Sequence, residues 1–93
     1  MSDTIKTLQE TIRERKLHPR EGSYTCELFA QGKPRILKKV GEEAAEVVIA
    51  AALESSERLV SESADLIYHL LVALVNQCLG WDDVEAELKR RFH

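Results

Sequence analysis

The stretch that decides the fold is residues 38–52, KKVGEEAAEVVIAAA, in which acids stand directly against a run of valine, isoleucine and alanine. The acids are Glu42, Glu43 and Glu46. At about 100° per residue, the three share one sector of a helix, along the edge of its apolar face. The stretch therefore predicts a long helix that carries a row of carboxylates beside buried surface.

The same juxtaposition returns in residues 62–75, ESADLIYHLLVALV. Here Glu62 and Asp65 open one of the most apolar segments of the chain, and with His69 and Asn76 they form a narrow polar stripe at helical spacing. A stripe this narrow is not a solvated face. If this helix packs antiparallel to the first, as a short serine connection favours, the two acidic sectors face one another.

Caps, glycines and prolines divide the rest of the chain into helices, and no segment shows the period-two alternation of a strand. We expect helices over about residues 3–15, 23–31, 34–54, 57–79 and 82–91. Ser2 or Asp3 caps the first, Gly80 follows the end of the fourth, and Asp82 with Glu85 makes a capping box for the last. The predicted fold class is all-α, a bundle of four to five helices.

Length and composition fit one soluble domain spanning residues 1–93. The chain is 44% hydrophobic and 31% charged, and its net charge of −3 argues against a surface for nucleic acid or anionic membranes. The N-terminus lacks the basic flank and apolar core of a signal peptide, so we expect a cytoplasmic protein without a membrane partner. Cys26 and Cys78 lack CxxC spacing and are expected to be buried small hydrophobes rather than a disulfide or a zinc site.

The segment from Leu66 to Leu79 is apolar at nearly every helical angle, which predicts a helix covered on most sides. A domain of 93 residues has little with which to cover it. Because closed two-fold dimers are the commonest assembly, we expect a homodimer in which helices from two copies complete the bundle.

Four or five carboxylates that share a partly dry space repel one another strongly unless cations neutralise them. The predicted ligands are all hard oxygens, without a Glu-x-x-His motif or a nearby cysteine, which favours Mg²⁺, or Mn²⁺, over zinc or a di-iron centre. Mg²⁺ keeps water and substrate phosphate oxygens in its remaining positions. The pattern therefore points to phosphate-ester or phosphoanhydride chemistry.

An alternative interpretation leaves the first acids on a solvated face, because Lys38 with Glu42 and Lys39 with Glu43 stand at i, i+4 spacing. This interpretation does not explain the acids at the head of the second apolar helix. For His69, a hydrogen bond to a neighbouring group and a contact with substrate are equally good expectations.

Glu42-Glu43-x-x-Glu46, followed after fifteen intervening residues by Glu62-x-x-Asp65, resembles the EExxE and ExxD signature of the MazG-like all-α nucleoside-triphosphate pyrophosphohydrolases. Within that group, SYTCELFAQGKPRILKKVGEEAAEVVIAA and SADLIYHLLVAL are similar to the phosphoribosyl-ATP pyrophosphohydrolase family. The resemblance implies metal-dependent hydrolysis of phosphoribosyl-ATP to phosphoribosyl-AMP and pyrophosphate, the second step of histidine biosynthesis. It also implies a monofunctional chain, because the Cys- and His-bearing cyclohydrolase domain of fused relatives has no counterpart in this sequence.

Each site residue has a role under this resemblance. The expected metal ligands are Glu43, Glu46, Glu62 and Asp65. Glu42 and Glu43 are the expected catalytic residues, with Glu42, or whichever glutamate is not committed to metal, activating the attacking water. The candidate substrate contacts are Lys38, Lys39 and His69. Two rival functions stay open, a housecleaning nucleotide pyrophosphohydrolase of the same fold and a non-enzymatic helical dimerisation module.

Overall fold

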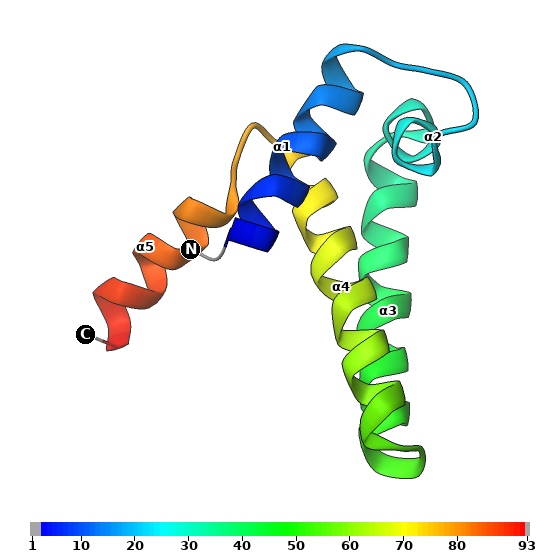
Figure 1. The fold of residues 1–93 in the computed structure, drawn as a ribbon, viewed down its shortest axis with the longest axis vertical. Helices are drawn as coiled ribbons and strands as arrows, with labels where there is room; N and C mark the ends of the chain where they lie inside the picture. The colour runs from blue at the N-terminus through cyan, green and yellow to red at the C-terminus, as the bar shows by residue number, and fades with distance from the viewer. Residues whose placement is uncertain (1–2, 93) are drawn as a thin grey trace.

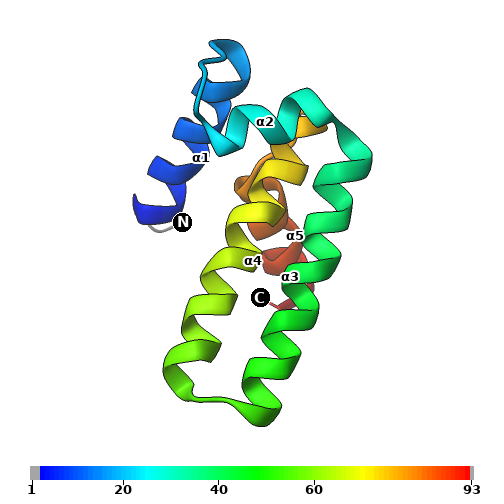
Figure 2. The same cartoon turned by 90° about the vertical axis from the view of Figure 1, so that its right-hand side faces the viewer.

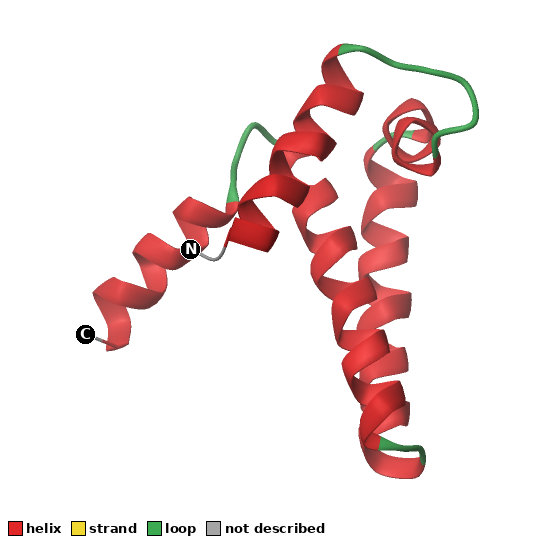
Figure 3. Ribbon diagram, viewed as in Figure 1, coloured by secondary structure: helices red, strands yellow, loops and turns green. Residues whose placement is uncertain are grey.

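The computed structural model describes residues 3–92, and five helices without a strand make up that part of the chain (Figures 1 and 3). The helices are α1 (Asp3–Leu17), α2 (Tyr24–Gln31), α3 (Lys33–Leu53), α4 (Ser56–Asn76) and α5 (Trp81–Phe92). The all-α prediction is confirmed, with element bounds within three residues of those expected. Ser2, one of the two residues expected to cap α1, lies outside the described residues.

Helices α3 and α4 form a long antiparallel hairpin, and α1 lies beside the C-terminal half of α4 (Figures 1 and 2). The hairpin turns sharply because Ser55 caps α4, its hydroxyl accepting the Arg58 backbone N–H at 3.1 Å. The core packs residues of α1, α2, α3 and α4 together at the end of the hairpin away from its turn. Its buried residues are Ile12, Leu28, Ile36, Leu71, Val72 and Val75.

Helix α2 begins and ends as the sequence predicts. The hydroxyl of Ser23 accepts the backbone N–H of Cys26 at 3.2 Å, which satisfies an otherwise unpaired donor of the first turn. Gly32 ends the helix with φ 87°, a left-handed conformation that other residues adopt at a cost. Pro34 then occupies the first turn of α3, where its missing N–H is not needed.

The predicted end of α4 is wrong by three residues. The helix ends at Asn76, and Cys78 rather than Gly80 takes the left-handed position beyond it, with φ 63°. The N–H of Leu79 donates to Leu74 O at 2.8 Å and that of Cys78 to Val75 O at 3.0 Å, the paired bonds of a Schellman motif. Cys78 is exposed and Cys26 is half-buried, so neither is the fully buried hydrophobe expected, and both thiols are free.

The start of α5 also differs from the prediction. The cap is Gly80, whose N–H donates to the Asp83 carboxylate at 2.8 Å, so the reciprocal bond forms two residues before the expected Asp82–Glu85 pair. A Cβ on Gly80 would lie 2.5 Å from Arg13 Nη2 and from Asp82 Oδ1, so these flexible side chains would have to move to admit one. Helix α1 also holds α5, since Gln9 Oε1 accepts the Trp81 N–H at 2.5 Å.

Helix α4 is long and apolar enough to cross a membrane by length and composition, and 28% of its most apolar window is buried. The core helix of a soluble protein passes the same test, so the test alone assigns no membrane. Within the described chain, the half of the hairpin nearest its turn has no further helix beside it (Figures 1 and 2). Several large apolar side chains are exposed there, namely Val48, Ile49, Leu53 and Val60.

Candidate metal centre

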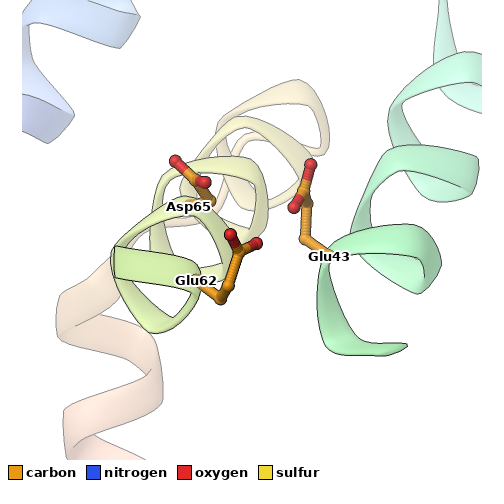
Figure 4. A group of neighbouring side chains, drawn as sticks. All are labelled: Glu43, Glu62 and Asp65. Atoms are coloured by element: carbon orange, nitrogen blue, oxygen red, sulfur yellow. The ribbon is translucent and has the colours of Figure 1, made fainter. Parts of the chain in front are cut away.

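Three carboxylates meet across the α3–α4 hairpin. Glu43 reaches from α3 toward α4, on which Glu62 and Asp65 occupy successive turns (Figure 4). One oxygen from each of these three side chains lies within 4.8 Å of the other two. One acid of the α3 sector, Glu43, therefore faces the two acids of α4.

The local sequence explains why these three acids converge. Glu62 and Asp65 are three residues apart, so they share a face of α4, and the antiparallel turn brings Glu43 opposite them. Their exposure differs: Glu62 is only 7% exposed, Glu43 is half-buried and Asp65 is exposed. The group thus has a dry side formed by Glu62 and an open side formed by Asp65, which suits a site that a ligand enters from solvent.

Two basic side chains compensate the acids. Lys39 Nζ lies 3.3 Å from Glu43 Oε1 and 3.6 Å from Glu42 Oε1. Burial alone would lower the pKa of the Lys39 ammonium, but the hydrogen bond to Glu43, with charge effects of Tyr24, Glu43 and Glu42, holds that pKa above its usual value. On the other helix, Arg58 Nη2 lies 2.6 Å from Glu62 Oε1.

The other predicted site residues lie around this group rather than in it. Glu42 and Glu46 are exposed on α3, and neither belongs to the set of oxygens within 4.8 Å. Lys38 is exposed on the same helix, while Lys39 is half-buried against the acids. The lysines therefore differ in position, and Lys39 is the one next to the carboxylates.

His69 is buried, with 6% exposure, and both of its ring nitrogens are engaged. Nδ1 lies 2.8 Å from the carbonyl oxygen of Asp65, which can only accept, so Nδ1 carries the proton. In the neutral ring Nε2 is then an acceptor, and the Tyr24 hydroxyl donates a hydrogen bond to it at 2.9 Å. The chain of donors runs from Tyr24 through His69 to the backbone of Asp65.

Two residues near the centre, Arg58 and Tyr24, are absent from the sequence prediction. Arg58 precedes Glu62 by four residues, and this i, i+4 spacing is a signal that could have found it. The approach of Tyr24 has no such signal, because 45 residues separate it from His69. It depends on the way α2 crosses the end of the hairpin.

The donor set fits a hard divalent cation. All three converging groups are carboxylates, and the most buried of them, Glu62, already needs a positive partner. Oxygen-only sites of this kind suit Mg²⁺ or Mn²⁺, which accept carboxylates together with water or phosphate oxygens. The chemistry available to such a site is attack of water on a phosphorus atom whose oxygens lie against the cation.

Comparison with known proteins adds an independent finding. Residues 5–92 match the family described as phosphoribosyl-ATP pyrophosphohydrolase. The chain is 50% identical over 91 residues to a phosphoribosyl-ATP pyrophosphatase of Metallosphaera sedula, covering 98% of both chains, and 49% identical over 87 residues to one of Limosilactobacillus fermentum, covering 94% of this chain and 82% of the other.

A longer relative contains the same unit. The histidine biosynthesis bifunctional protein HisIE of Caldanaerobacter subterraneus is 50% identical over 90 residues, which are 97% of this chain and 44% of that protein. The match therefore falls on less than half of the bifunctional relative.

Proposed function

The chain belongs to the phosphoribosyl-ATP pyrophosphohydrolase family, and we propose that the group of Glu43, Glu62 and Asp65 is the metal centre of this activity. The protein is a hydrolase of histidine biosynthesis that converts phosphoribosyl-ATP and water into phosphoribosyl-AMP and pyrophosphate. The observation that carries the assignment of the site is the meeting of three carboxylates from two helices within 4.8 Å.

The metal proposed for this site is Mg²⁺, with Mn²⁺ as a substitute. Its ligands would be Glu43, Glu62 and Asp65, joined by Glu46, which is exposed one turn along α3 and free to change rotamer. When bound, such a cation neutralises phosphate charge and stabilises the leaving pyrophosphate.

The remaining acids and bases have roles at the reacting phosphate. Glu42 is exposed and precedes Glu43 directly in sequence, and its role would be to orient the attacking water and accept its proton. Lys39, already held against the acids, is positioned to contact the triphosphate, and Lys38 extends the positive charge toward solvent. His69 supports this arrangement, and a direct contact with substrate is its alternative role.

The activity is tested by offering purified protein phosphoribosyl-ATP with Mg²⁺ beside ATP, dUTP and dCTP, and measuring pyrophosphate release. The proposal predicts release from phosphoribosyl-ATP that greatly exceeds release from the other nucleotides and that stops in excess EDTA. A preference for dUTP or dCTP would instead indicate a housecleaning enzyme. Absence of release from every nucleotide would leave the dimerisation module as the better account.

A homodimer is part of the proposal. The chain exposes 6306 Å², whereas a compact monomer of this mass exposes roughly 5,500 Å². The excess of about 800 Å² equals what each partner buries in a standard interface. Exposed apolar side chains such as Leu53 and Val60 support the hairpin end as the surface that a second copy would cover to complete the bundle around α4.

The proposal treats residues 1–93 as one catalytic domain that works in the cytoplasm, with the small-molecule substrate and a second copy as its partners and without nucleic acid or membrane. Its support is the family match, which spans residues 5–92, together with the net charge of −3. Sedimentation and cell fractionation test the assembly and the location separately from the chemistry.

A further inference from the structure

We propose that the aromatic ring of Tyr24 contacts the purine of the substrate and so contributes to binding of its nucleoside part. The inference rests on the proposed function, in which the triphosphate of the substrate lies at the carboxylate trio of Glu43, Glu62 and Asp65. It concerns a residue of α2, outside the two helices that carry the acids.

Tyr24 lies next to the phosphate end of the site. Its hydroxyl bonds His69 Nε2 at 2.9 Å, and His69 stands one helical turn beyond Asp65 on α4. The Tyr24 hydroxyl is therefore held by a residue that stands one helical turn, ~5 Å, from Asp65. That spacing is comparable to the length of the ribose that separates the α-phosphate from the purine.

The ring is held rigidly. Because His69 Nδ1 donates to the Asp65 carbonyl, Nε2 accepts from Tyr24, and the hydroxyl end of the ring is fixed. Tyr68 stacks against Tyr24 with ring centroids 6.2 Å apart and planes 28° apart, while His69 meets it edge-on at 5.7 Å. The first turn of α2 is further tied to α4 by a hydrogen bond between Thr25 and Tyr68.

Despite these contacts, Tyr24 remains 41% exposed. A tyrosine that is anchored by its hydroxyl and packed against Tyr68, yet 41% exposed, offers a preorganised aromatic surface for a flat ring. Stacking of a base on an aromatic side chain depends on the ring and not on the hydroxyl, and its loss costs about tenfold or more in affinity. The chemical class that fits is a purine attached through ribose to the phosphates at the acids.

The test separates purine binding from phosphate binding. For Tyr24→Leu, the KM for phosphoribosyl-ATP and the inhibition constant of AMP should each rise about tenfold or more, since both ligands carry the purine. The inhibition constant of inorganic pyrophosphate and the affinity for Mn²⁺ should stay within about twofold, since neither touches the ring. Tyr24→Phe should keep KM within about threefold because it retains the aromatic face.

Phe92→Leu is the matched control, because Phe92 is an exposed aromatic residue on α5, away from the acids, and its loss should change none of these constants. The proposal is overturned if Tyr24→Leu leaves the inhibition constant of AMP unchanged, or if it raises the inhibition constants of pyrophosphate and AMP equally. It is also overturned if Tyr24→Phe raises the KM for phosphoribosyl-ATP as much as Tyr24→Leu does. Wild-type protein that releases no pyrophosphate from phosphoribosyl-ATP would overturn the proposed function instead, so the two failures are distinguishable.

Discussion

Arg58 Nη2 lies 2.6 Å from Oε1 of Glu62, a carboxylate that is only 7% exposed. A buried carboxylate is costly unless a positive charge or a set of donors compensates it. Arg58, four residues earlier on the same face of α4, supplies that charge from a largely solvent-exposed position. A divalent cation at Glu43, Glu62 and Asp65 would supply compensation to the same carboxylate.

Replacing Arg58 by glutamine should therefore lower stability only when metal is withheld. In EDTA we expect a loss of about 1 kcal/mol, the scale of a half-exposed ion pair with one buried partner. Saturating Mg²⁺ should remove most of that difference, because it binds the folded state and compensates Glu62. Thermal unfolding with and without Mg²⁺ measures both quantities.

The control for this experiment is Arg91→Gln, which breaks an ion pair with the exposed Glu87 on α5. Its effect should be small and independent of Mg²⁺. An Arg58 effect that Mg²⁺ leaves unchanged would show that the arginine and the metal act on different groups.

Val60 tests the dimer. It is 70% exposed in the single chain, so Val60→Lys should be harmless to a monomer. If a second copy covers the hairpin end, the buried ammonium should weaken association by several kcal/mol and yield monomers in sedimentation at micromolar concentration. Leu17→Lys, at an equally exposed position on α1, should leave the dimer intact. A wild-type protein that is monomeric and fully active would contradict the shared-bundle proposal.

Cys78 should be replaceable by glycine with a gain in stability. It is exposed and has φ 63° at the position after α4 where glycine is preferred. We expect about 1 kcal/mol, which raises Tm by about 4 °C or more in a domain of this size. Cys78→Ala, which removes the thiol without relieving the backbone, should give no such gain in calorimetry, and an equal gain would assign the effect to the thiol.

The hairpin and the end of α4 differ in how well the sequence predicts them. The hairpin and its facing acids follow from periodicity and from the short turn at Ser55, both of which are local signals. The end of α4 does not, because glycine is only preferred just past a helix end, and here Cys78 takes the left-handed position while Gly80 lies at the start of α5.

In the candidate site, too, some residues are predictable from local spacing and others are not. Glu62 and Asp65 could be paired from their spacing, and Glu43 could be placed opposite them once an antiparallel turn was assumed. Tyr24 could not be found, because its contact with His69 joins helices that are 45 residues apart in sequence and depends on the crossing of α2 over the hairpin. Packing between distant elements, rather than local pattern, determines that part of the site.

Tyr68 should contribute to the loss of stability at alkaline pH. Burial raises the pKa of its phenol above the usual value near 10, which outweighs the lowering by its hydrogen bond with Thr25. Because the folded state holds this proton more tightly than the unfolded state, the stabilisation is complete below about pH 10 and is lost as pH rises through the raised pKa.

The Tyr68→Phe variant should show a shallower loss of unfolding free energy between about pH 10 and 12 than the wild type. Denaturant unfolding at several pH values, with phenolate absorbance recorded in parallel, measures this slope. Identical slopes in the two proteins would mean that Tyr68 ionises with an ordinary pKa.

The most direct test of the metal centre is pyrophosphate release from phosphoribosyl-ATP by Glu43→Gln and Asp65→Asn at saturating Mg²⁺. Each change removes a carboxylate charge from the trio while preserving shape, so helical circular dichroism should be unchanged and turnover should fall by about 100-fold or more. Glu57→Gln, an exposed acid in the first turn of α4, should retain wild-type activity as the control. Retention of more than about a tenth of wild-type activity by either trio variant would contradict the assignment of Glu43, Glu62 and Asp65 as the metal centre.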